Sequence, residues 1–426
     1  MEENITATPT PEAALAPKRK KKGLLIGGIL AAALVLAAGT FFTACGSKGT
    51  TYPSQKHYSQ GGSSSSSTQA TQESTSATTD NTSTAAVDDK NALFHCGLVP
   101  AKANGKWGYI DKTGQFVIEP QFDYVDRFSD NGLALAATKV VGRLGYIDTE
   151  GNYAIDPQFH YAEPFTSNGL ALVGIGDDNG GEASLRYGFI DKNGNYVVDL
   201  RLNYARSFTE FGLAAVCVDG KWGYIDEMGS YVIEPQLDGA GDFANNGLAA
   251  VRYSDKKYGY IDGTGKCVIT PQFDDANKFA DNGLAAVKVD GKYGYIDKEG
   301  NYAIASQFDV AFSFNDGAAV VAVDSKYGVI DESGNYLITP QYERGDIGFS
   351  CVSGRIWFAE NLFDFGYLDK SGNEVIPVQF TYASYFYTDG YAGVGIGGID
   401  GKCGIIDTDG NYLIEPQFDD IGYRDD

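Results

Sequence analysis

Asn282-Gly-Leu-Ala-Ala-Val-Lys-Val-Asp-Gly-Lys-Tyr-Gly-Tyr-Ile-Asp-Lys-Glu-Gly300 is the stretch that sets the architecture, because close copies of it fill most of this chain of 426 residues. The copies are recognised by a glycine that follows an aromatic residue in most of them. Tandem copies at a spacing of about 36 residues indicate a repeat array rather than separate domains. The nine glycines are Gly108, Gly145, Gly188, Gly223, Gly259, Gly294, Gly328, Gly366 and Gly404.

Each copy predicts short β-strands. In Lys221-Trp-Gly-Tyr-Ile-Asp226 the strand period places Trp222 and Tyr224 on one face and Gly223 and Ile225 on the other. A glycine at this position is expected to let a backbone or ring approach closely. The return strand, such as Tyr231-Val-Ile-Glu, is expected to end where Pro-Gln interrupts the ladder. In the connector that follows, represented by residues 123–128, the phenylalanine is expected to fill the gap between neighbouring units.

The two strands are joined by Asp-x-x-Gly in all nine copies. The aspartate is expected to cap the turn by accepting a hydrogen bond from the backbone two residues on, and the glycine to supply a positive φ. Turn capping explains this pattern better than calcium binding, which needs several oxygen ligands at close spacing. The predicted structural turn residues are Asp111, Gly114, Asp148, Gly151, Asp191, Gly194, Asp226, Gly229, Asp262, Gly265, Asp297, Gly300, Asp331, Gly334, Asp369, Gly372, Asp407 and Gly410.

Three short strands per unit and the absence of helical periodicity predict an all-β fold. A closed propeller usually needs four strands and forty or more residues per blade, so an open or curved array of nine hairpin repeats is the first expectation. A closed, propeller-like ring is the alternative. It is kept because the first unit opens with a strand near Gly97-Leu98 and the last ends at Gln417-Phe418, so the two ends are complementary.

The motifs at residues 106–111 and 221–226 resemble the WG (KWG) repeat family of bacterial proteins. The resemblance covers about residues 97–419, although only Trp107 and Trp222 are literal tryptophans at this position. It implies a surface or secreted β-repeat protein without an assigned reaction. No catalytic residues are carried over from the family.

The N-terminal part predicts a membrane anchor. Residues 1–22 are polar and end in the basic cluster at 18–22, and residues 23–44 are free of charge and long enough to cross a bilayer as a helix. The basic flank predicts one crossing with the C-terminal part outside. A bacterial lipoprotein signal with lipidation at Cys45 fits the same stretch, so the transmembrane and lipid-anchored alternatives both stay open. Residues 45–90 are rich in Ser and Thr and predict a disordered linker that ends where the repeat domain, residues 91–426, begins.

Charge excludes one class of partner. The repeat domain carries 25 basic and 49 acidic residues, a balance of −24 (25 minus 49). Such a surface repels phosphate backbones, so nucleic-acid binding is not expected.

No catalytic or metal-binding constellation is apparent, and no cofactor is implied. The histidines His57, His95 and His160 have no partner at the spacing of a triad or zinc site. The array cysteines, including Cys217, Cys267 and Cys403, occupy apolar positions and are expected to be buried thiols, with a disulfide among them left open. Acids that converge in space for glycoside hydrolysis are not excluded by sequence.

The repeat pattern breaks in three places, where a binding face is expected. Residues 176–182 lengthen a hairpin loop, and Arg344-Gly-Asp346 lies in an irregular stretch, although a three-residue match carries no adhesion assignment. An aromatic cluster supplies the candidate binding residues for stacking on sugars, with core packing as the alternative: Tyr382, Tyr385, Phe386, Tyr387 and Tyr391.

The sequence therefore predicts a non-enzymatic, cell-envelope-anchored binding or scaffold module that presents its repeats outside the membrane to a cell-wall, glycan or protein ligand. Two alternatives remain. One is an extracellular glycan-acting enzyme with acids in the loops at 177–182 or around Asp346, and the other is a structural spacer.

Overall fold

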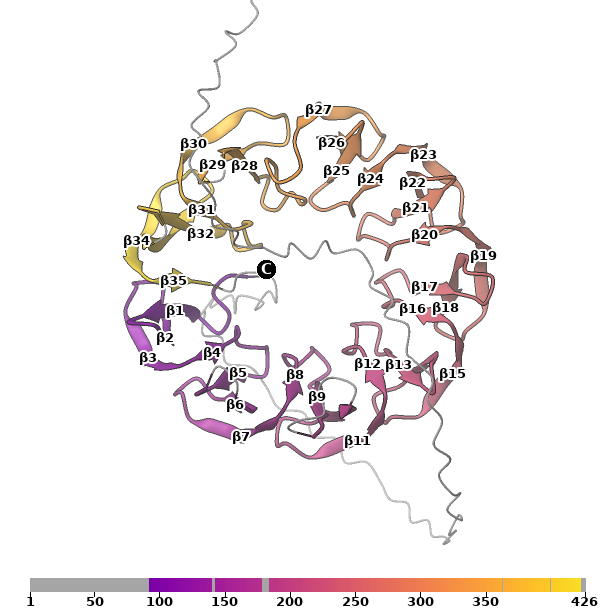
Figure 1. Ribbon diagram of the computed structural model, residues 1–426, viewed down its shortest axis with the longest axis horizontal. Helices are drawn as coiled ribbons and strands as arrows, with labels where there is room; N and C mark the ends of the chain where they lie inside the picture. The colour runs from indigo at the N-terminus through magenta and orange to yellow at the C-terminus, as the bar shows by residue number, and fades with distance from the viewer. Residues whose placement is uncertain (1–91, 140–141, 178–183, 362, 399, 423–426) are drawn as a thin grey trace, which may run out of the picture. The chain divides into compact units, whose positions relative to one another are not determined.

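The computed structural model describes residues 92–139, 142–177, 184–361, 363–398 and 400–422, and these residues contain β-strands and turns but no α-helix. Nine antiparallel sheets follow one another along the chain and close into a ring, which is a nine-bladed β-propeller (Figure 1). The prediction of an all-β fold with nine repeats is confirmed. The expectation of an open array is wrong, and the alternative of a closed ring is right.

Blade 6 shows the plan of one sheet. From the centre of the ring outward it contains β20 (Asp275–Ala276), β21 (Ala285–Val289), β22 (Lys292–Ile296) and β23 (Tyr302–Phe308). The two-residue strand lies at the inner rim and the seven-residue strand at the outer rim (Figure 1). The innermost strand comes from the segment that the sequence presents as a connector, so four strands fit into about 36 residues. This is why the repeat length argued wrongly against a propeller.

The other blades repeat this order. Blade 1 holds β35 (Asp420–Ile421), β1 (Val99–Ala103), β2 (Lys106–Ile110) and β3 (Phe116–Phe122), and blade 2 holds β4 (Tyr124–Val125), β5 (Ala134–Ala137), β6 (Leu144–Ile147) and β7 (Tyr153–Phe159). Blade 3 holds β8 (Tyr161–Ala162), β9 (Ala171–Ile175), β10 (Arg186–Ile190) and β11 (Tyr196–Leu202), and blade 4 holds β12 (Tyr204–Ala205), β13 (Ala214–Val218), β14 (Lys221–Ile225) and β15 (Tyr231–Leu237). Blade 5 holds β16 (Gly239–Ala240), β17 (Leu248–Arg252), β18 (Tyr258–Asp262) and β19 (Cys267–Phe273), and blade 7 holds β24 (Val310–Ala311), β25 (Ala318–Val323), β26 (Lys326–Asp331) and β27 (Tyr336–Tyr342). Blade 8 has three strands, β28 (Ile356–Asn361), β29 (Asp364–Leu368) and β30 (Glu374–Phe380), and blade 9 holds β31 (Tyr382–Ala383), β32 (Tyr391–Ile396), β33 (Lys402–Asp407) and β34 (Tyr412–Phe418).

The ring closes through the C-terminal strand. β35 pairs with β1, opposing Ile421 to Ala101, so the end of the chain supplies the innermost strand of the first blade. The carboxylate of Asp419 spans this joint, since it accepts hydrogen bonds from Lys402 Nζ of blade 9 at 2.6 Å and from the Gly105 amide of blade 1 at 3.1 Å. Closure removes the two free sheet edges that an open array would expose.

The repeated glycine marks a close approach of two strands. In blade 6 the register moves from Tyr295 opposite Ile304 to Tyr293 opposite Phe308, so three residues of β23 bulge against Gly294. A Cβ at Gly294 would lie 2.6 Å from the Ile304 carbonyl oxygen, and the eight equivalent glycines meet the same obstacle at 2.2–2.7 Å. The predicted close approach is therefore confirmed. In blades that have Pro-Gln at this bulge the outer strand continues through it, as β3 does at Pro120 and β15 at Pro235, so the expectation that it ends there is wrong.

In six of the nine blades, a tyrosine that we call the interblade tyrosine joins the blade to its neighbour. It is the second aromatic of the motif, and its hydroxyl donates to a carbonyl of the next connector at 2.6–2.9 Å. Its ring packs on the connector phenylalanine at 4.7–4.8 Å between centroids. The phenylalanine thus lies between blades, as predicted. The interblade tyrosines are Tyr109, Tyr146, Tyr224, Tyr260, Tyr295 and Tyr367.

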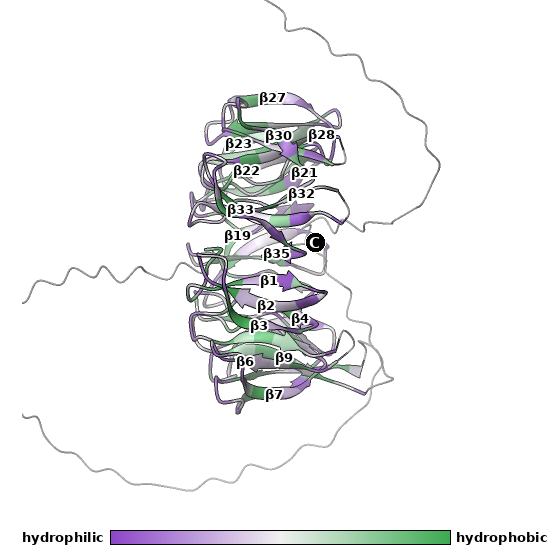
Figure 2. Ribbon diagram, turned by 90° about the vertical axis from the view of Figure 1, so that its left-hand side faces the viewer, coloured by the Kyte–Doolittle hydropathy of each residue, from purple (hydrophilic) through white to green (hydrophobic). Residues whose placement is uncertain are grey.

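The hydrophobic core lies between the blades. Trp222 and Tyr224 pack toward blade 5, with Phe243 and Val251, whereas Ile225 packs toward blade 3, with Phe189 and Val198, as the strand period predicts. Viewed edge-on, the ring carries its hydrophobic residues along the strands (Figure 2). A cluster that joins Val99 and Ile110 to Ile405 and Phe418 fills the joint between blades 9 and 1.

We expect Gly294→Ala to lower the free energy of unfolding by about 3 kcal/mol, because the methyl group must displace backbone atoms of the bulge. Gly291 of the same blade is the matched control. It has a φ of +83° and nothing within 4 Å of its Cβ position, so Gly291→Ala should cost only about 1 kcal/mol. Urea denaturation measures both variants. Equal losses would contradict the close-approach explanation.

Candidate functional site

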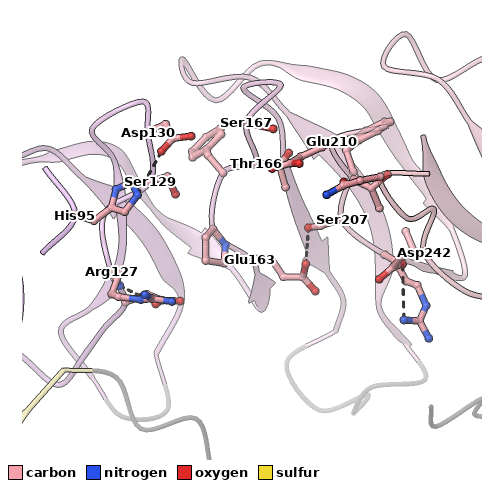
Figure 3. Close-up of a pocket in the computed structure, with 18 of the residues that line it drawn as sticks. His95, Arg127, Ser129, Asp130, Glu163, Thr166, Ser167, Ser207, Glu210 and Asp242 are labelled. Atoms are coloured by element: carbon pink, nitrogen blue, oxygen red, sulfur yellow. Dashed lines mark hydrogen bonds and ion pairs between the residues drawn. The ribbon is translucent and has the colours of Figure 1, made fainter. Parts of the chain in front are cut away.

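A cavity of about 710 Å³ lies where the connectors of six consecutive blades meet, and we call it the connector cavity (Figure 3). A connector is the segment between the innermost strand of a blade and the next strand outward. In blade 1, whose innermost strand is the C-terminal β35, the segment that precedes β1 takes the place of the connector and supplies His95, and Lys278 and Asp281 come from the connector of blade 6. The volume falls within the range of about 300–1,000 Å³ that is typical of ligand sites.

The wall of the connector cavity is charged, with acids in excess. It contains three basic side chains, Arg127, Arg206 and Lys278, together with His95. The six carboxylates come from five different connectors: Asp126, Asp130, Glu163, Glu210, Asp242 and Asp281. Phe128, Phe165 and Phe208 also reach the wall and supply its apolar part.

Several of these side chains hold one another in place. The Glu163 carboxylate accepts hydrogen bonds from the hydroxyls of Tyr161 and Ser207, which joins blade 3 to blade 4. Between blades 4 and 5, Arg206 Nη1 lies 3.8 Å from Asp242 Oδ1. Between blades 1 and 2, His95 Nε2 lies 3.3 Å from Asp130 Oδ1 (Figure 3). Burial, reinforced by the Glu163 charge, raises the pKa of Tyr161 well above its usual range, so its hydroxyl remains a proton donor.

Three buried polar atoms in this wall make no hydrogen bond with protein groups: His95 Nδ1, Arg206 Nε and Asp242 Oδ1. His95 is the most enclosed of the three residues, with its side chain only 3% exposed. Buried polar atoms without partners are uncommon because leaving them unsatisfied costs about 1–3 kcal/mol each. Three such atoms therefore lie in the wall of one cavity.

The fold fixes the backbone of the connectors while leaving some of their side chains free to vary. In blade 2 the Asp126 carbonyl accepts the Tyr109 hydroxyl at 2.6 Å, the Asp126 amide donates to the Leu135 carbonyl at 3.0 Å, and Phe128 is buried. Arg127 and Asp130 lie on either side of the anchored phenylalanine and belong to the cavity wall. The anchored positions recur from blade to blade, whereas the wall positions differ.

The nine predicted turn aspartates lie at the hairpins between the third and outermost strands. In each, Oδ1 accepts the backbone amide two residues on at 2.8–3.1 Å. The turn glycines have φ of +78° to +88°. Each also lies against the outer strand of the preceding blade, as Gly300 does on Ile269. Within the described residues no three His, Cys, Asp or Glu side chains gather to hold a metal ion.

The five candidate binding aromatics do not form one platform. Phe386 is the connector phenylalanine of blade 9, 3% exposed and packed on Tyr367, so it belongs to the core. The Tyr385 hydroxyl accepts the Phe349 amide at 2.9 Å, and Tyr382 pairs with Gly395 inside the sheet.

The other two aromatics of the cluster pack at the joint with blade 1. Arg127 lies 5.0 Å from the Tyr387 ring, and Phe94 lies 5.8 Å from the Tyr391 ring. Phe386 is therefore in the core because it stands at the connector phenylalanine position of the repeat, and its aromatic neighbours are engaged in contacts within the protein.

Other predicted features have different outcomes. Cys217 and Cys403 are buried as expected, but Cys267 is exposed because it begins an outer strand whose first side chain faces solvent. Asp346 belongs to the irregular entry of blade 8, where its carbonyl accepts the Ala359 amide. Most of the loop 176–182 lies outside the described residues.

The predicted anchor also lies outside the described residues, as do the linker and Cys45. The described part of the chain contains no helix that is long and apolar enough to cross a membrane.

Sequence reasoning missed the connector cavity. Its residues are dispersed from His95 to Asp281 and converge only when six repeats stand side by side in a ring. The available signal was the excess of charged residues next to the connector phenylalanines.

The repeated motif and the sheets it builds define the chain as a tandem-repeat β-propeller. The family described as WG containing repeat matches residues 107–139, 145–177, 187–222, 222–256, 258–293, 293–327, 327–358, 365–398 and 404–424. The chain belongs to this family, which confirms the resemblance drawn from the motifs. No curated protein matches the sequence.

Solved structures share the fold at low identity. A crystal structure of a eukaryotic initiation factor aligns over 76% of this chain and 96% of its own, with 13% identity and a TM-score of 0.56. Dipeptidyl peptidase 4 of Porphyromonas gingivalis aligns over 68% of this chain and 58% of its own, with 11% identity and a TM-score of 0.48. BamB of Moraxella catarrhalis aligns over 64% and 93%, with 11% identity and a TM-score of 0.39. The first supports the propeller fold alone, and the other two carry no argument.

The turn aspartates are expected to make the stability of the fold sensitive to acid. Hydrogen bonds from the side chains of Thr113, Thr264 and Asn335, and from backbone amides, lower the pKa of Asp111, Asp262 and Asp331. A carboxyl whose pKa is lower in the folded state stabilises the fold above its unfolded pKa of about 3.9 and loses this contribution as the pH falls through the folded value. We therefore expect the midpoint of urea denaturation to fall below about pH 4.

The double variant Asp262→Asn/Asp331→Asn tests the assignment to these groups. Its midpoint should change less between pH 5 and pH 3 than that of the native chain, because two of the titrating carboxyls are gone. An unchanged or larger acid response in the variant would assign the effect to other carboxylates.

Proposed function

We propose that this WG-repeat propeller is a non-catalytic binding module of the cell envelope and that the connector cavity is its ligand site. The observation that carries the proposal is the cavity itself, with its mixed charges and three buried polar atoms that make no hydrogen bond. Concave sites with a few convergent polar groups are the usual location of ligand binding. The ring around the cavity is closed by its own strands, which suits a rigid binding scaffold.

The N-terminal sequence supports a position outside the membrane. The apolar segment 23–44 follows the basic cluster 18–22, which favours a single crossing with the propeller on the extracellular side. The linker 45–90 would hold the propeller at a distance from the bilayer. Lipidation at Cys45 would give the same topology with a different anchor.

Cys267 offers a direct test of this topology, because the residue is exposed and forms no disulfide. In intact cells a membrane-impermeant maleimide should label the native chain and should label Cys267→Ser much less. Lysed cells provide the control, in which the native chain is labelled whatever its topology. Labelling of Cys267 only after lysis would place the propeller inside and overturn this part of the proposal.

A blocked cavity tests the ligand site. Ser167 lines the connector cavity and is exposed, so Ser167→Trp should fill the entrance without disturbing the core. Full-length protein in detergent should be captured by purified cell-wall fractions or by members of a glycan and peptide panel, and the variant should lose about tenfold or more in affinity. Ser371→Trp, on an exposed hairpin outside the cavity, is the matched control.

The outcomes separate the remaining functions. Capture that both tryptophan variants retain would place the ligand site elsewhere on the ring. Absence of capture by every fraction would favour a structural spacer. Turnover of a glycan by the purified protein would favour an enzyme, and either of the last two results would overturn the proposal.

A further inference from the structure

Blade 1 is the place where the ring is closed without a continuous chain. In the other four-stranded blades the innermost strand runs through its connector directly into the next strand. In blade 1 these two strands are β35 and β1, which come from opposite ends of the propeller and pair at two positions, Ala101 with Ile421 and Lys102 with Asp420. Closure here depends on hydrogen bonds and side-chain contacts alone, and we call this place the seam.

The joint between blades 9 and 1 is also built without the interblade tyrosine. Ile405 of blade 9 stands at the position of that tyrosine. An isoleucine cannot donate the hydrogen bond that Tyr295 donates to the Phe312 carbonyl between blades 6 and 7. The seam therefore lacks two of the links that hold most other blades together, and it needs another fastening.

Residues 92–98, which we call the strap, supply this fastening. Phe94 of the strap corresponds to the connector phenylalanine Phe314 of blade 7, and the two side chains are 4% and 6% exposed. In both segments the phenylalanine is followed by an isolated bridge across a tight turn, with φ of 51° and 75° in the strap and of 50° and 72° in blade 7. The strap is thus the second half of a connector whose first half lies at the other end of the chain.

On one side the strap is fastened to blade 9. The Phe94 amide donates to Asp389 Oδ2 at 3.2 Å, and the Phe94 ring packs edge-on against Tyr391 with 5.8 Å between centroids. Lys112 Nζ of blade 1 lies 5.3 Å from the centroid of each of these rings, within the range of a cation–π contact. Leu93 is fully buried in the same joint.

On the other side the strap is fastened to the connector of blade 2. Arg127 Nη1 donates to the Ala92 carbonyl at 3.2 Å, and His95 Nε2 lies 3.3 Å from Asp130 Oδ1. Ala92 stands two residues before Phe94, and in other connectors the carbonyl at this position accepts the interblade tyrosine. Arg127 therefore uses the acceptor that the seam leaves open. Because Arg127 and His95 line the connector cavity, the strap also holds part of the cavity wall.

We propose that the strap is a releasable clasp of the ring. While it is seated, it holds blades 9, 1 and 2 together across the seam. When it leaves, the ring opens between β35 and β1, and His95 and Arg127 lose their places in the cavity wall. The predicted linker 45–90 leads into the strap, so the strap connects this end of the chain with the connector cavity. The contacts that fasten it are independent of any ligand in the cavity.

Hydrogen–deuterium exchange of the full-length protein in detergent, followed by mass spectrometry, tests the clasp. Phe94→Ala should raise the exchange rate at least about tenfold in two places, because local opening there becomes easier. One is the seam, where the Asp419 and Gly422 amides donate to carbonyls of β1 and its neighbourhood. The other is the connector of blade 2, where the Ser129 amide donates to the Leu133 carbonyl.

Phe314→Ala is the matched control, since it removes the same ring from the same turn in blade 7. It should raise exchange within blade 7, as at the Phe312 amide that donates to the Val320 carbonyl, and leave the seam unchanged. Equal acceleration of the seam in both variants would reduce the effect to general destabilisation. A seam that exchanges at the native rate in Phe94→Ala would mean that β35 closes the ring alone. Either result would overturn the proposal.

A milder variant keeps the test decisive if Phe94→Ala does not fold. Asp389→Ala removes the acceptor of the Phe94 amide and leaves the packed rings in place, so exchange at the seam should rise about threefold or more. Asn282→Ala changes the equivalent turn position of blade 6, where the side chain accepts the Leu284 amide, and should leave the seam unchanged. Native exchange at the seam in Asp389→Ala, or the same increase in both variants, would count against the clasp.

Discussion

The structure depends on the contact that the interblade tyrosine makes with the connector of the next blade. A fully buried ring such as Tyr295 has to place its hydroxyl on an acceptor, and the carbonyl of Phe312 takes that role at 2.7 Å. The same ring packs on Phe314 of that connector. One side chain therefore sets both the spacing of two blades and the course of the segment between them. Repeated around the ring, this contact turns weak three- and four-stranded sheets into one cooperative core.

Fixing the connectors has a consequence for function. Where the tyrosine and the phenylalanine hold the connector backbone, the positions beside them can carry charged side chains, and some of these also pair across blades, as Glu163 does with Ser207. In blades 2 to 6 these positions hold acids and bases that line a single cavity. The interblade tyrosine is replaced by Phe189 in blade 3, by Val329 in blade 7 and by Ile405 in blade 9. Phe312 of blade 7 stacks on Phe349 at the entry of blade 8. The inner rim is thus uneven although the blades share one plan, and the connector cavity lies on the part formed by blades 1 to 6.

Much of a single blade could be predicted from the sequence. The Asp-x-x-Gly turns, the two faces of the motif strand, the close approach at the glycine and the connector phenylalanine are all decided within about 36 neighbouring residues, where spacing and residue type suffice. The prediction of an open array failed because the number of strands in a repeat was judged from the length of the repeat. Two residues such as Asp275 and Ala276 make a strand only because the next strand of the same blade presents a free edge to them. The proline bulge of the outer strand was misjudged for a related reason, since the partner glycine that accepts it lies on another strand.

The sequence by itself determined the all-β repeat, its family and the hairpins, because these rest on local turn chemistry and on a period repeated nine times. Only the tertiary structure decided that the array closes, since pairing of Ile421 with Ala101 joins residues from opposite ends of the domain. It also decided where the candidate site lies. His95 and Asp281 line one cavity because six connectors converge at the inner rim, whereas Phe386, which sequence reasoning assigned to a binding cluster, is drawn into the core by Tyr367. Contacts between distant repeats depend on the angle between blades, and no local pattern encodes that angle.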